Sequence, residues 1–463
     1  MINKCEVLIL GAGFSGLSTS YHIGHDRCLV LEKTKNLFGH CKSTNKNGAV
    51  WDEGPHVSFT ENDYVRKLFS DSVKGEYAEY KVNVGNYYKR TWIDHPAQVN
   101  LYQVPEPLRS ECLESFLLAF DQGEIETDDY GEWLKAAFGH VFSSNFPAAY
   151  TRKYWTCEPE ELETSWIGRR VHRPGKEDVV KGAVAPLSHK KHYIKKVRYP
   201  KVGGYEAFGR GLSVNADVKL NHEVVNIDLQ EKIVSCSNGE TFKYEKIIST
   251  IPMPLFVSLC KQSTKEVIAE AKKLKCTSGY LVNVHVPHKS IRDENWLYVY
   301  DEDLLSTRIT FVNKLDGVSK STCMMQVEVY ESDYKMLNKT NEEIESLVVQ
   351  ELYKMGLINE KLFNKSGKIE SHVTYFKWGN VIFDHNRKNA LNIVLNWLTN
   401  YGLIREKDDL EPACDWSESN EGVAGEVFLA GRYSQWKYFW SDDCVLRGRQ
   451  LGDLLSLGLK CCD

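Results

Sequence analysis

Residues 6–32 read EVLILGAGFSGLSTSYHIGHDRCLVLE, and this stretch decides the fold. A short apolar run ends at Gly11, a segment with helical spacing follows Gly16, and a second apolar run closes on Glu32. Strand, GxGxxG turn, helix, strand and acid in this order predict a dinucleotide-binding βαβ unit. Gly11 allows the tight turn, Gly13 lets the backbone approach a pyrophosphate, and Gly16 allows close packing of helix on strand. The N-terminus of the helix then faces the phosphates.

Glu32 and the end of the chain narrow the choice of cofactor. Glu32 lies 21 residues after Gly11, where a carboxylate can accept the ribose hydroxyls of an adenosine half and disfavours a 2′-phosphate, so FAD or NAD is favoured over NADP. An ordinary structural turn is the alternative interpretation. Residues 427–431, VFLAG, predict a second strand and glycine turn, and a helical pattern follows from Asp443. Flavoproteins with two dinucleotide-binding domains return at their C-terminus in this way, which favours FAD.

Composition and charge exclude several other classes of protein. The 463 residues include 58 Lys and Arg against 63 Asp and Glu, a net charge of −5, which argues against a nucleic-acid partner. No stretch approaches the ~18 consecutive apolar residues of a membrane span, and the N-terminus does not read as a secretion signal. Thirteen Cys without a CxxC pair predict reduced thiols, no metal site and a cytoplasmic location.

Further short segments form an ordered set along the chain. They are GPHVSF at 54–59, YW at 154–155, WIGRRV at 166–171, RYP at 198–200 with GG at 203–204, WLY at 296–298 with Arg308, and GR at 431–432 with WKY at 436–438. In order and spacing they resemble the UDP-galactopyranose mutase family, especially its eukaryotic-type branch. That family belongs to a wider FAD superfamily of amine oxidases and protoporphyrinogen oxidases.

The resemblance implies an α/β fold with a discontinuous Rossmann-like FAD-binding domain, a helical domain and an antiparallel β-sheet substrate domain. Helical spacing through residues 104–195 and alternating apolar residues through 278–330 agree with the last two. We expect the FAD-binding domain at residues 1–80, 200–255 and 425–463, the helical substrate or lid domain at 100–199, and the sheet domain at 81–99 and 256–424.

The resemblance also implies a reaction, the interconversion of pyranose and furanose forms of a nucleotide sugar in polysaccharide biosynthesis. In that reaction N5 of reduced FAD attacks the anomeric carbon with no net redox change. Planar arginines suit the diphosphate, so Arg170 and Arg308 are the expected clamp. With His56, beside the flavin, they are the expected catalytic residues. NADPH or NADH is the expected reductant, and homo-oligomer formation is left open.

Two groups of residues are expected to hold the ligands. The expected FAD contacts are Gly11, Gly13, Phe14, Ser15, Gly16, Glu32, Lys33, Gly39, His56, Val225, Gly431, Arg432 and Tyr438. The expected substrate contacts are Gln98, Asn100, Trp155, Arg170, Trp296, Arg308 and Tyr438. Each Trp and Arg also has a plain structural interpretation, as a core residue or an ion-pair partner.

The sequence departs from the family's pattern at three places. They are Gly39-His40 for a doubled glycine, Asp94-His95-Pro96 for a Pro-Tyr-Pro-like stretch, and Asn380, near which the family usually has a tyrosine that holds a diphosphate oxygen. The runner-up hypothesis is therefore an FAD-dependent amine or C–H oxidase or dehydrogenase of the same fold, with an apolar pocket and no diphosphate clamp. The third hypothesis is a protein that binds the cofactor but catalyses no reaction.

Overall fold

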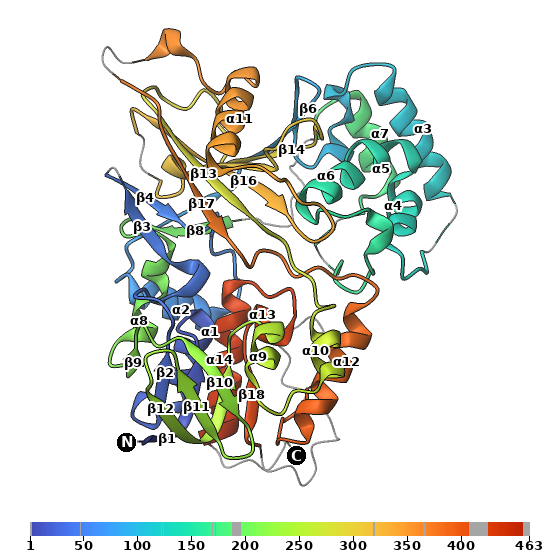
Figure 1. Cartoon of the computed structure of the whole chain (residues 1–463). Helices are drawn as coiled ribbons and strands as arrows, with labels where there is room; N and C mark the ends of the chain where they lie inside the picture. The colour runs from blue at the N-terminus through green and yellow to red at the C-terminus, as the bar shows by residue number, and fades with distance from the viewer. Residues whose placement is uncertain are drawn as a thin grey trace. The chain divides into compact units, whose positions relative to one another are not determined.

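Segments from the beginning, middle and end of the chain build one unit, and the segments between them build another (Figure 1). In this computed structural model the first unit comprises Met1–Tyr77, Val202–Lys275 and Asn386–Asp463, and the second comprises Ala78–Lys201 and Cys276–His385. The residues that the structure describes are 2–46, 48–121, 123, 125–168, 170–171, 173–187, 196–317, 320–363, 367–406 and 425–456.

The sheet of the first unit has, within these residues, seven strands in the order β10-β11-β12-β1-β2-β9, with β18 also paired to β12. The bounds are β1 (Ile2–Leu10), β2 (Cys28–Leu31), β9 (Val218–Lys219), β10 (Val224–Asp228), β11 (Ile233–Cys236), β12 (Thr241–Ser249) and β18 (Val427–Leu429). β1 pairs in parallel with β12 and β2, and β12 pairs in parallel with β18. Val7–Leu10 of β1 are at most 1% exposed, as expected for a central parallel strand.

Helices α1 (Phe14–Ile23) and α14 (Ser441–Ser456) pack closely along each other in this unit. A Cβ at Gly448 would lie 2.4 Å from Ser18 Oγ, and one at Gly452 would lie 2.4 Å from His22 Cβ, so small residues permit the approach. The unit also contains β3 (Ser43–Lys46), β4 (Ala49–Asp52), α2 (Asp63–Ser72), α8 (Arg210–Ser213), α9 (Met253–Leu259), α10 (Lys265–Ala271), α12 (Arg387–Thr399) and α13 (Arg432–Gln435).

The second unit contains another sheet, with seven strands among the described residues in the order β17-β13-β16-β15-β14-β6-β7. The bounds are β6 (Val84–Tyr88), β7 (Thr91–Asp94), β13 (Ser278–Val286), β14 (Trp296–Val299), β15 (Arg308–Phe311), β16 (Cys323–Glu331) and β17 (Glu370–Phe376). β14 pairs with β6 in parallel, and the other neighbours are antiparallel. β5 (Tyr77–Lys81) and β8 (Lys196–Pro200) form a separate two-stranded sheet.

Alternation along the strands gives this second sheet two different faces. Its apolar face joins α11 (Asn341–Lys354) in one buried cluster that includes Val282, Leu297, Ile309, Val327, Ile344, Val348 and Leu352. Side chains one position away along each strand point to the opposite side. They include Asn283, Arg308, Thr310, Gln326 and Glu328, which we call the polar face. Thr310 is paired with Gln326, and Arg308 with Glu328.

Helices make up most of the remaining second unit: α3 (Leu108–Phe120), α4 (Tyr130–Phe138), α5 (His140–Asn145), α6 (Pro147–Tyr154) and α7 (Lys176–Val184). The expected α/β class, with a discontinuous unit around one sheet and a second, mainly antiparallel sheet, is confirmed. The division into domains differs from the expected one. Contacts join the helices and the antiparallel sheet in one unit, and they assign residues 256–275 and 386–406 to the first unit.

Neither a membrane-spanning helix nor a cluster of metal ligands is found in the described ranges. No helix there combines the length and apolar character needed to cross a bilayer. No group of three or more His, Cys, Asp or Glu side chains in those ranges is arranged to hold a metal ion.

Candidate functional site

The turn after β1 has the geometry that its glycines allow. Gly11 has φ +101°, a conformation that glycine adopts without strain, and a Cβ at Gly16 would lie 1.9 Å from Gly11 O. α1 begins at Phe14 with Gly13 as its N-cap, and no side chain of the described structure caps it. The first N–H groups of α1, at the positive end of the helix dipole, are therefore suited to an anion.

Glu32 holds this turn through hydrogen bonds from the backbone. Its Oε2 accepts from Ala12 N–H at 3.0 Å, and its Oε1 accepts from Thr34 N–H at 2.9 Å. Each carboxylate oxygen keeps a second lone pair, so Glu32 can still accept the ribose hydroxyls expected of it. His222 N–H also donates to Glu32 O at 2.8 Å, which places the segment after β9 against the acid.

Gly39 lies against the same turn. A Cβ at Gly39 would lie 3.2 Å from Gly13 Cα, and Gly39 has φ +53°. Phe14, another expected cofactor residue, packs its ring in the core. Its ring centroid lies 6.2 Å from that of Phe38 and 6.0 Å from that of Tyr205. Phe14 therefore offers a ligand its backbone rather than its ring.

β18 leads into a second glycine turn beside the start of α1. Gly431 has φ +98°, and a Cβ there would lie 2.2 Å from Ser15 Oγ. Ser434 Oγ donates to Ser249 O at 2.7 Å, which fixes the turn to the end of β12. The structure thus brings together Gly431 and Ser15, two of the residues expected to contact the cofactor.

Arg432 and Tyr438 lie together after this turn. Arg432 Nε donates to Phe439 O at 2.6 Å. The guanidinium carbon of Arg432 lies 5.3 Å from the centroid of the Tyr438 ring, within the range of a cation–π interaction. The ring and the guanidinium therefore order each other.

His56 stacks on a tyrosine that the sequence analysis did not identify. Its ring centroid lies 5.3 Å from that of Tyr205, and its Nδ1 lies 3.0 Å from Gly54 O. Tyr205 is fully buried, and its hydroxyl lies 2.6 Å from Ser441 Oγ at the start of α14. Burial raises the pKa of Tyr205 well above its usual value, so the phenol is neutral. The Gly203-Gly204 pair just before Tyr205 was the one signal in the sequence that could have pointed to this tyrosine.

Two other expected cofactor residues occupy more exposed positions. The side chain of Lys33 is exposed. Val225 lies in β10, where the register with β11 shifts, and it is 49% exposed. Asn221 precedes Val225 and donates to Thr34 O at 3.0 Å. Asn221 and His222, just before Val225, are therefore the residues that contact the Glu32 segment. The sequence did not reveal them, because β9, the strand before them, has only two residues and shows no clear pattern.

These features fit a dinucleotide cofactor. Gly11, Gly13 and Gly431 leave backbone surface without side chains, and the first turn of α1 presents N–H groups beside it. Glu32 supplies an acceptor on the same turn. Such a cradle binds phosphates through the backbone and a ribose through the acid.

Arg308 occupies the polar face of the second unit. Its Nη2 donates to Glu328 Oε1 at 2.9 Å, and its Nε donates to Glu328 Oε2. Burial alone would lower the pKa of Arg308, but the charge and hydrogen bonds of Glu328 raise it well above its usual value. The Arg308 side chain keeps 22% exposure, against 3% for Glu328, so the guanidinium is fixed from one edge and open at another.

Tyrosines surround this ion pair. Tyr330 OH donates to Glu328 Oε1. Burial first, and then the charge of Glu328, raise the pKa of Tyr330 well above its usual value. Burial likewise raises the pKa of Tyr150 well above its usual value, although the nearby charge of Arg308 offsets part of this rise. Both phenols are therefore neutral hydroxyl groups, and in the described residues Tyr150 OH is buried without a hydrogen-bond partner.

A series of aromatic contacts joins Arg170 to this group. Arg170 Nη1 donates to Trp166 O at 3.3 Å. Ring centroids are 5.2 Å apart for Trp166 and Trp155, for Trp155 and Tyr154, and for Tyr154 and Tyr330. The structure therefore links the expected substrate residues Arg170 and Trp155 to the surroundings of Arg308.

Asn380, which departs from the family pattern, belongs to this cluster. Its Oδ1 accepts from Tyr154 OH at 2.9 Å, and its backbone N–H donates to Thr277 Oγ1 at 2.8 Å. It also interacts with Tyr330. The amide thus occupies a place among hydroxyl groups and can itself donate from Nδ2.

The remaining expected substrate residues lie at other places in the unit. Trp296 is buried on β14, opposite Thr310 of the polar face, and its Nε1 has no hydrogen-bond partner among the described residues. Asn100 Nδ2 donates to Pro96 O at 3.0 Å, a local contact. Gln98 is half-buried in a 3₁₀ turn before it. His95, the other departure, has its ring 5.1 Å from that of Tyr298.

Comparisons with known proteins agree with this geometry. A sequence profile described as flavin containing amine oxidoreductase matches residues 14–450. No curated protein sequence matches the chain at a significant level. A reduced UDP-galactopyranose mutase has a similar structure, with a TM-score of 0.85, 20% identity, and coverage of 98% of this chain and 96% of that one.

Two further solved structures are similar at 13% identity. A putative protoporphyrinogen oxidase from Exiguobacterium sp. 255-15 has a TM-score of 0.71, over 99% of this chain and 100% of that one. A putrescine oxidase bound to putrescine has a TM-score of 0.60, over 98% and 99%. The profile match spans most of the sequence, and the fold agrees with it. The chain therefore belongs to the family of flavin-containing amine oxidoreductases, which indicates that its dinucleotide cofactor is FAD.

Proposed function

We propose that the chain is an FAD-dependent mutase that interconverts the pyranose and furanose forms of a nucleotide sugar. The observation that carries the proposal is the guanidinium of Arg308, which Glu328 fixes from one edge while the other edge keeps its donors. The likeness in fold to a UDP-galactopyranose mutase agrees with this function. The sugar, the nucleotide and the setting in polysaccharide biosynthesis are parts of the proposal.

The diphosphate would bind at the open edge of Arg308. A guanidinium has five N–H donors, and two of them serve Glu328. Within the described residues Nη1 makes no hydrogen bond, and the side chain is partly exposed. Planar donors of this kind bind phosphate oxygens bidentately. Arg170 is proposed as the second cation, and Asn380 as a neutral donor.

Each unit would contribute one part of the chemistry. FAD supplies, when bound in its reduced form, the nucleophile for the anomeric carbon. In the first unit the glycine turns hold its phosphates, Glu32 orients its ribose, and the His56–Tyr205 stack fixes the histidine. In the second unit Arg308 and Arg170 retain the leaving diphosphate, and Trp155 provides a surface for the base. NADPH or NADH is the proposed reductant.

Family membership favours one other function, oxidation of an amine. An amine substrate is a cation and requires an acceptor in its pocket. The buried carboxylate of the polar face, Glu328, already accepts from Arg308 and Tyr330. What the cluster still offers a ligand is therefore the remaining guanidinium N–H groups of Arg308 and the hydroxyl of Tyr150, unpaired among the described residues, and these donors favour an anionic substrate.

The test replaces Arg308 by lysine, which keeps the charge opposite Glu328 but loses the planar donors. Arg292→Lys is the matched control, because Arg292 Nε also donates to a buried glutamate, Glu294, at 3.1 Å in the same unit. We expect Arg308→Lys to weaken UDP binding at least about tenfold, roughly 1.4 kcal/mol, with FAD content unchanged, and Arg292→Lys to bind normally. Equal UDP affinity in both variants, by calorimetry, would remove Arg308 from the proposal.

A further inference from the structure

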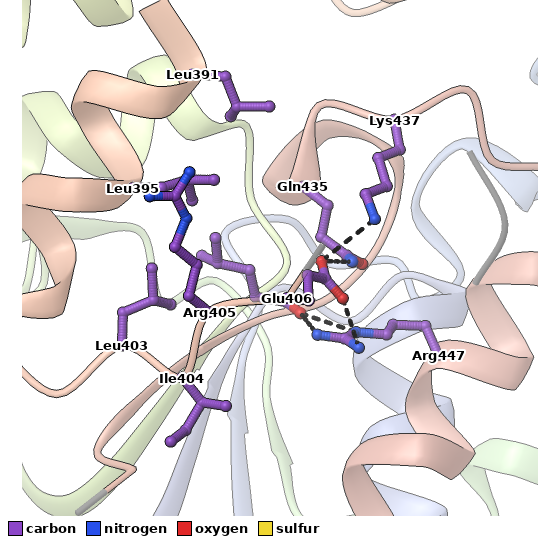
Figure 2. Close-up of a pocket in the computed structure, with 10 residues that line it drawn as sticks. Leu391, Leu395, Leu403, Ile404, Arg405, Glu406, Gln435, Lys437 and Arg447 are labelled. Carbon is purple, nitrogen blue, oxygen red and sulfur yellow. Dashed lines mark hydrogen bonds and ion pairs between the residues drawn. The ribbon is translucent and has the colours of Figure 1, made fainter. Parts of the chain in front are cut away.

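A buried charge cluster lies behind the glycine turn at Gly431. Glu406 interacts with Arg447 Nη1 at 2.8 Å and with Lys437 Nζ at 3.6 Å, and it accepts from Gln435 Nε2. Figure 2 shows the Glu406 carboxylate between these three side chains. The side chains of Lys437 and Arg447 are 4% and 2% exposed, and that of Glu406 is 15% exposed. Charges this deeply buried interact strongly because little water screens them.

The cluster is bonded to both ends of the turn. Gln435 Oε1 accepts from Gly431 N–H at 2.8 Å, in a buried hydrogen bond. Arg447 Nε and Nη2 each donate to Leu429 O at 3.2 Å, at the end of β18. Glu406 thus reaches Gly431 through Gln435 and Leu429 through Arg447. Removing its carboxylate would take away the acceptor that positions both Gln435 and Arg447.

Apolar side chains lie beside the cluster. One pocket is lined by Leu391, Leu395, Leu403, Ile404 and Leu429 together with Arg405, Glu406, Gln435, Lys437 and Arg447 (Figure 2). Leu403 is bridged to Val427 of β18. The segment that carries Glu406 is therefore anchored to the strand that leads into the turn.

We infer that Glu406 is a positioning residue of the flavin site, which sets both the geometry of the Gly431 turn and the charge behind it. The inference rests on the proposed placement of FAD at this turn. The Glu406 carboxylate partly cancels the positive charge of Lys437 and Arg447. Reduction of a flavin adds negative charge to its ring system, so fixed charge behind the turn shifts the reduction potential. Loss of Glu406 raises that potential, and loss of Lys437 lowers it.

The experiment compares Glu406→Gln, Lys437→Met and a control, Glu426→Gln, in the purified FAD-loaded chain. Glu426 also forms an ion pair in the first unit, with Lys232 Nζ at 2.7 Å, but it precedes β18 and has no bond to the turn in the described structure. The readouts are the midpoint potential of the bound flavin, by anaerobic titration against reference dyes, and the dissociation constant of FAD.

We expect a higher potential in Glu406→Gln with roughly tenfold weaker FAD binding, a lower potential in Lys437→Met, and no change in Glu426→Gln. A purely structural role would not give shifts of opposite sign. Unchanged potentials, or shifts of equal sign in the two cluster variants, would overturn the inference. If Glu406→Gln loses FAD, the sign of the potential shift in Lys437→Met decides: a lower potential supports the inference, and an unchanged or higher one overturns it. Nucleotide-sugar turnover is not a readout, so failure of the mutase proposal leaves this result interpretable.

Discussion

At the scale of single residues, the proposed FAD site depends on glycines that other residues replace poorly. Gly11 and Gly431 both have φ close to +100°, and Gly431 in addition lies against Ser15 Oγ. A left-handed backbone costs a non-glycine residue roughly 1–2 kcal/mol. A second, steric cost arises at Gly431, because the methyl group would displace Ser15 at the start of α1.

Replacing Gly431 by alanine separates these two costs. Gly239→Ala is the control, because Gly239 has φ +85° and a Cβ there would meet nothing within 4 Å. We expect Gly239→Ala to lose about 1 kcal/mol of unfolding free energy and Gly431→Ala to lose more, because its methyl group also meets Ser15. Only Gly431→Ala should lose FAD during gel filtration. Retention of stoichiometric FAD by Gly431→Ala, read from its absorbance, would contradict the placement of the cofactor at this turn.

Asp228 gives the first unit a stability that depends on acidity. A hydrogen bond from the backbone of Glu231, with others from Lys261 and Gln262, lowers the pKa of Asp228 from 3.8 to about 2. Because the folded pKa lies below the unfolded one, the stabilisation is present above the unfolded pKa and is lost as pH falls through the folded pKa.

Asp228→Asn should therefore be less stable than the wild-type chain at pH 7, and the difference should shrink as pH falls below about 4. Urea unfolding at a series of pH values measures the difference. The control is Asp71→Asn, which removes an exposed helix ion pair with Lys67 and should cost little at any pH. A stability difference for Asp228→Asn that stays constant with pH would show that the lowered pKa of Asp228 is not its cause.

Single residues also show what the sequence could and could not predict. The motif glycines and Glu32 were predictable, because their chemistry depends on spacing within one short segment. Tyr205, Glu328 and Glu406 were not predicted, because their partners lie far away in the sequence or on a neighbouring strand. Glu328 faces Arg308 only through the register of β15 and β16, which no local pattern reveals.

At the scale of elements, the close contact of α1 with α14 ties the two ends of the proposed cofactor site together. Gly448 and Gly452 of α14 meet Ser18 and His22 of α1. Helices approach this closely only where side chains are small. The alternation of β13 to β16 similarly separates the apolar core under α11 from the polar face that carries Arg308.

Gly448→Val tests the helix contact, because its side chain must displace Ser18. Overpacking of this kind costs about 1–3 kcal/mol, so we expect a lower melting temperature together with weaker FAD retention. Asp453→Val, at an exposed position of the same helix, is the control for helix propensity and should melt close to the wild type. Equal melting temperatures in the two variants would show that the helices are not packed as described.

At the scale of the whole molecule, the expected FAD residues all lie in the first unit, and most of the expected substrate residues lie in the second. The sequence predicted both sheets and the helical segment from their periodicity. It did not predict that α12 belongs to the first unit, because a helical pattern shows that a face is buried but not which core covers it. The expected boundary lies near residue 424, whereas contacts assign α12 to the first unit.

Leu352→Ala tests the independence of the two units. Leu352 of α11 is fully buried in the core of the second unit, so the change should cost about 2–5 kcal/mol there. We expect weaker UDP binding and earlier unfolding of the second unit, with FAD still bound per mole of protein at 25 °C. Gln350→Ala, exposed on the same helix, should change neither. Loss of FAD in Leu352→Ala would mean that the units do not fold separately.

The central claim, that this flavoprotein is a nucleotide-sugar mutase, is tested most directly by anaerobic turnover of UDP-galactofuranose. The purified protein is incubated with and without dithionite, and the products are separated by chromatography. We expect conversion to UDP-galactopyranose only when the flavin is reduced, with no net oxidation of the sugar. No conversion by a chain that holds and reduces its FAD normally, combined with peroxide release from an amine, would contradict the account and favour the oxidase.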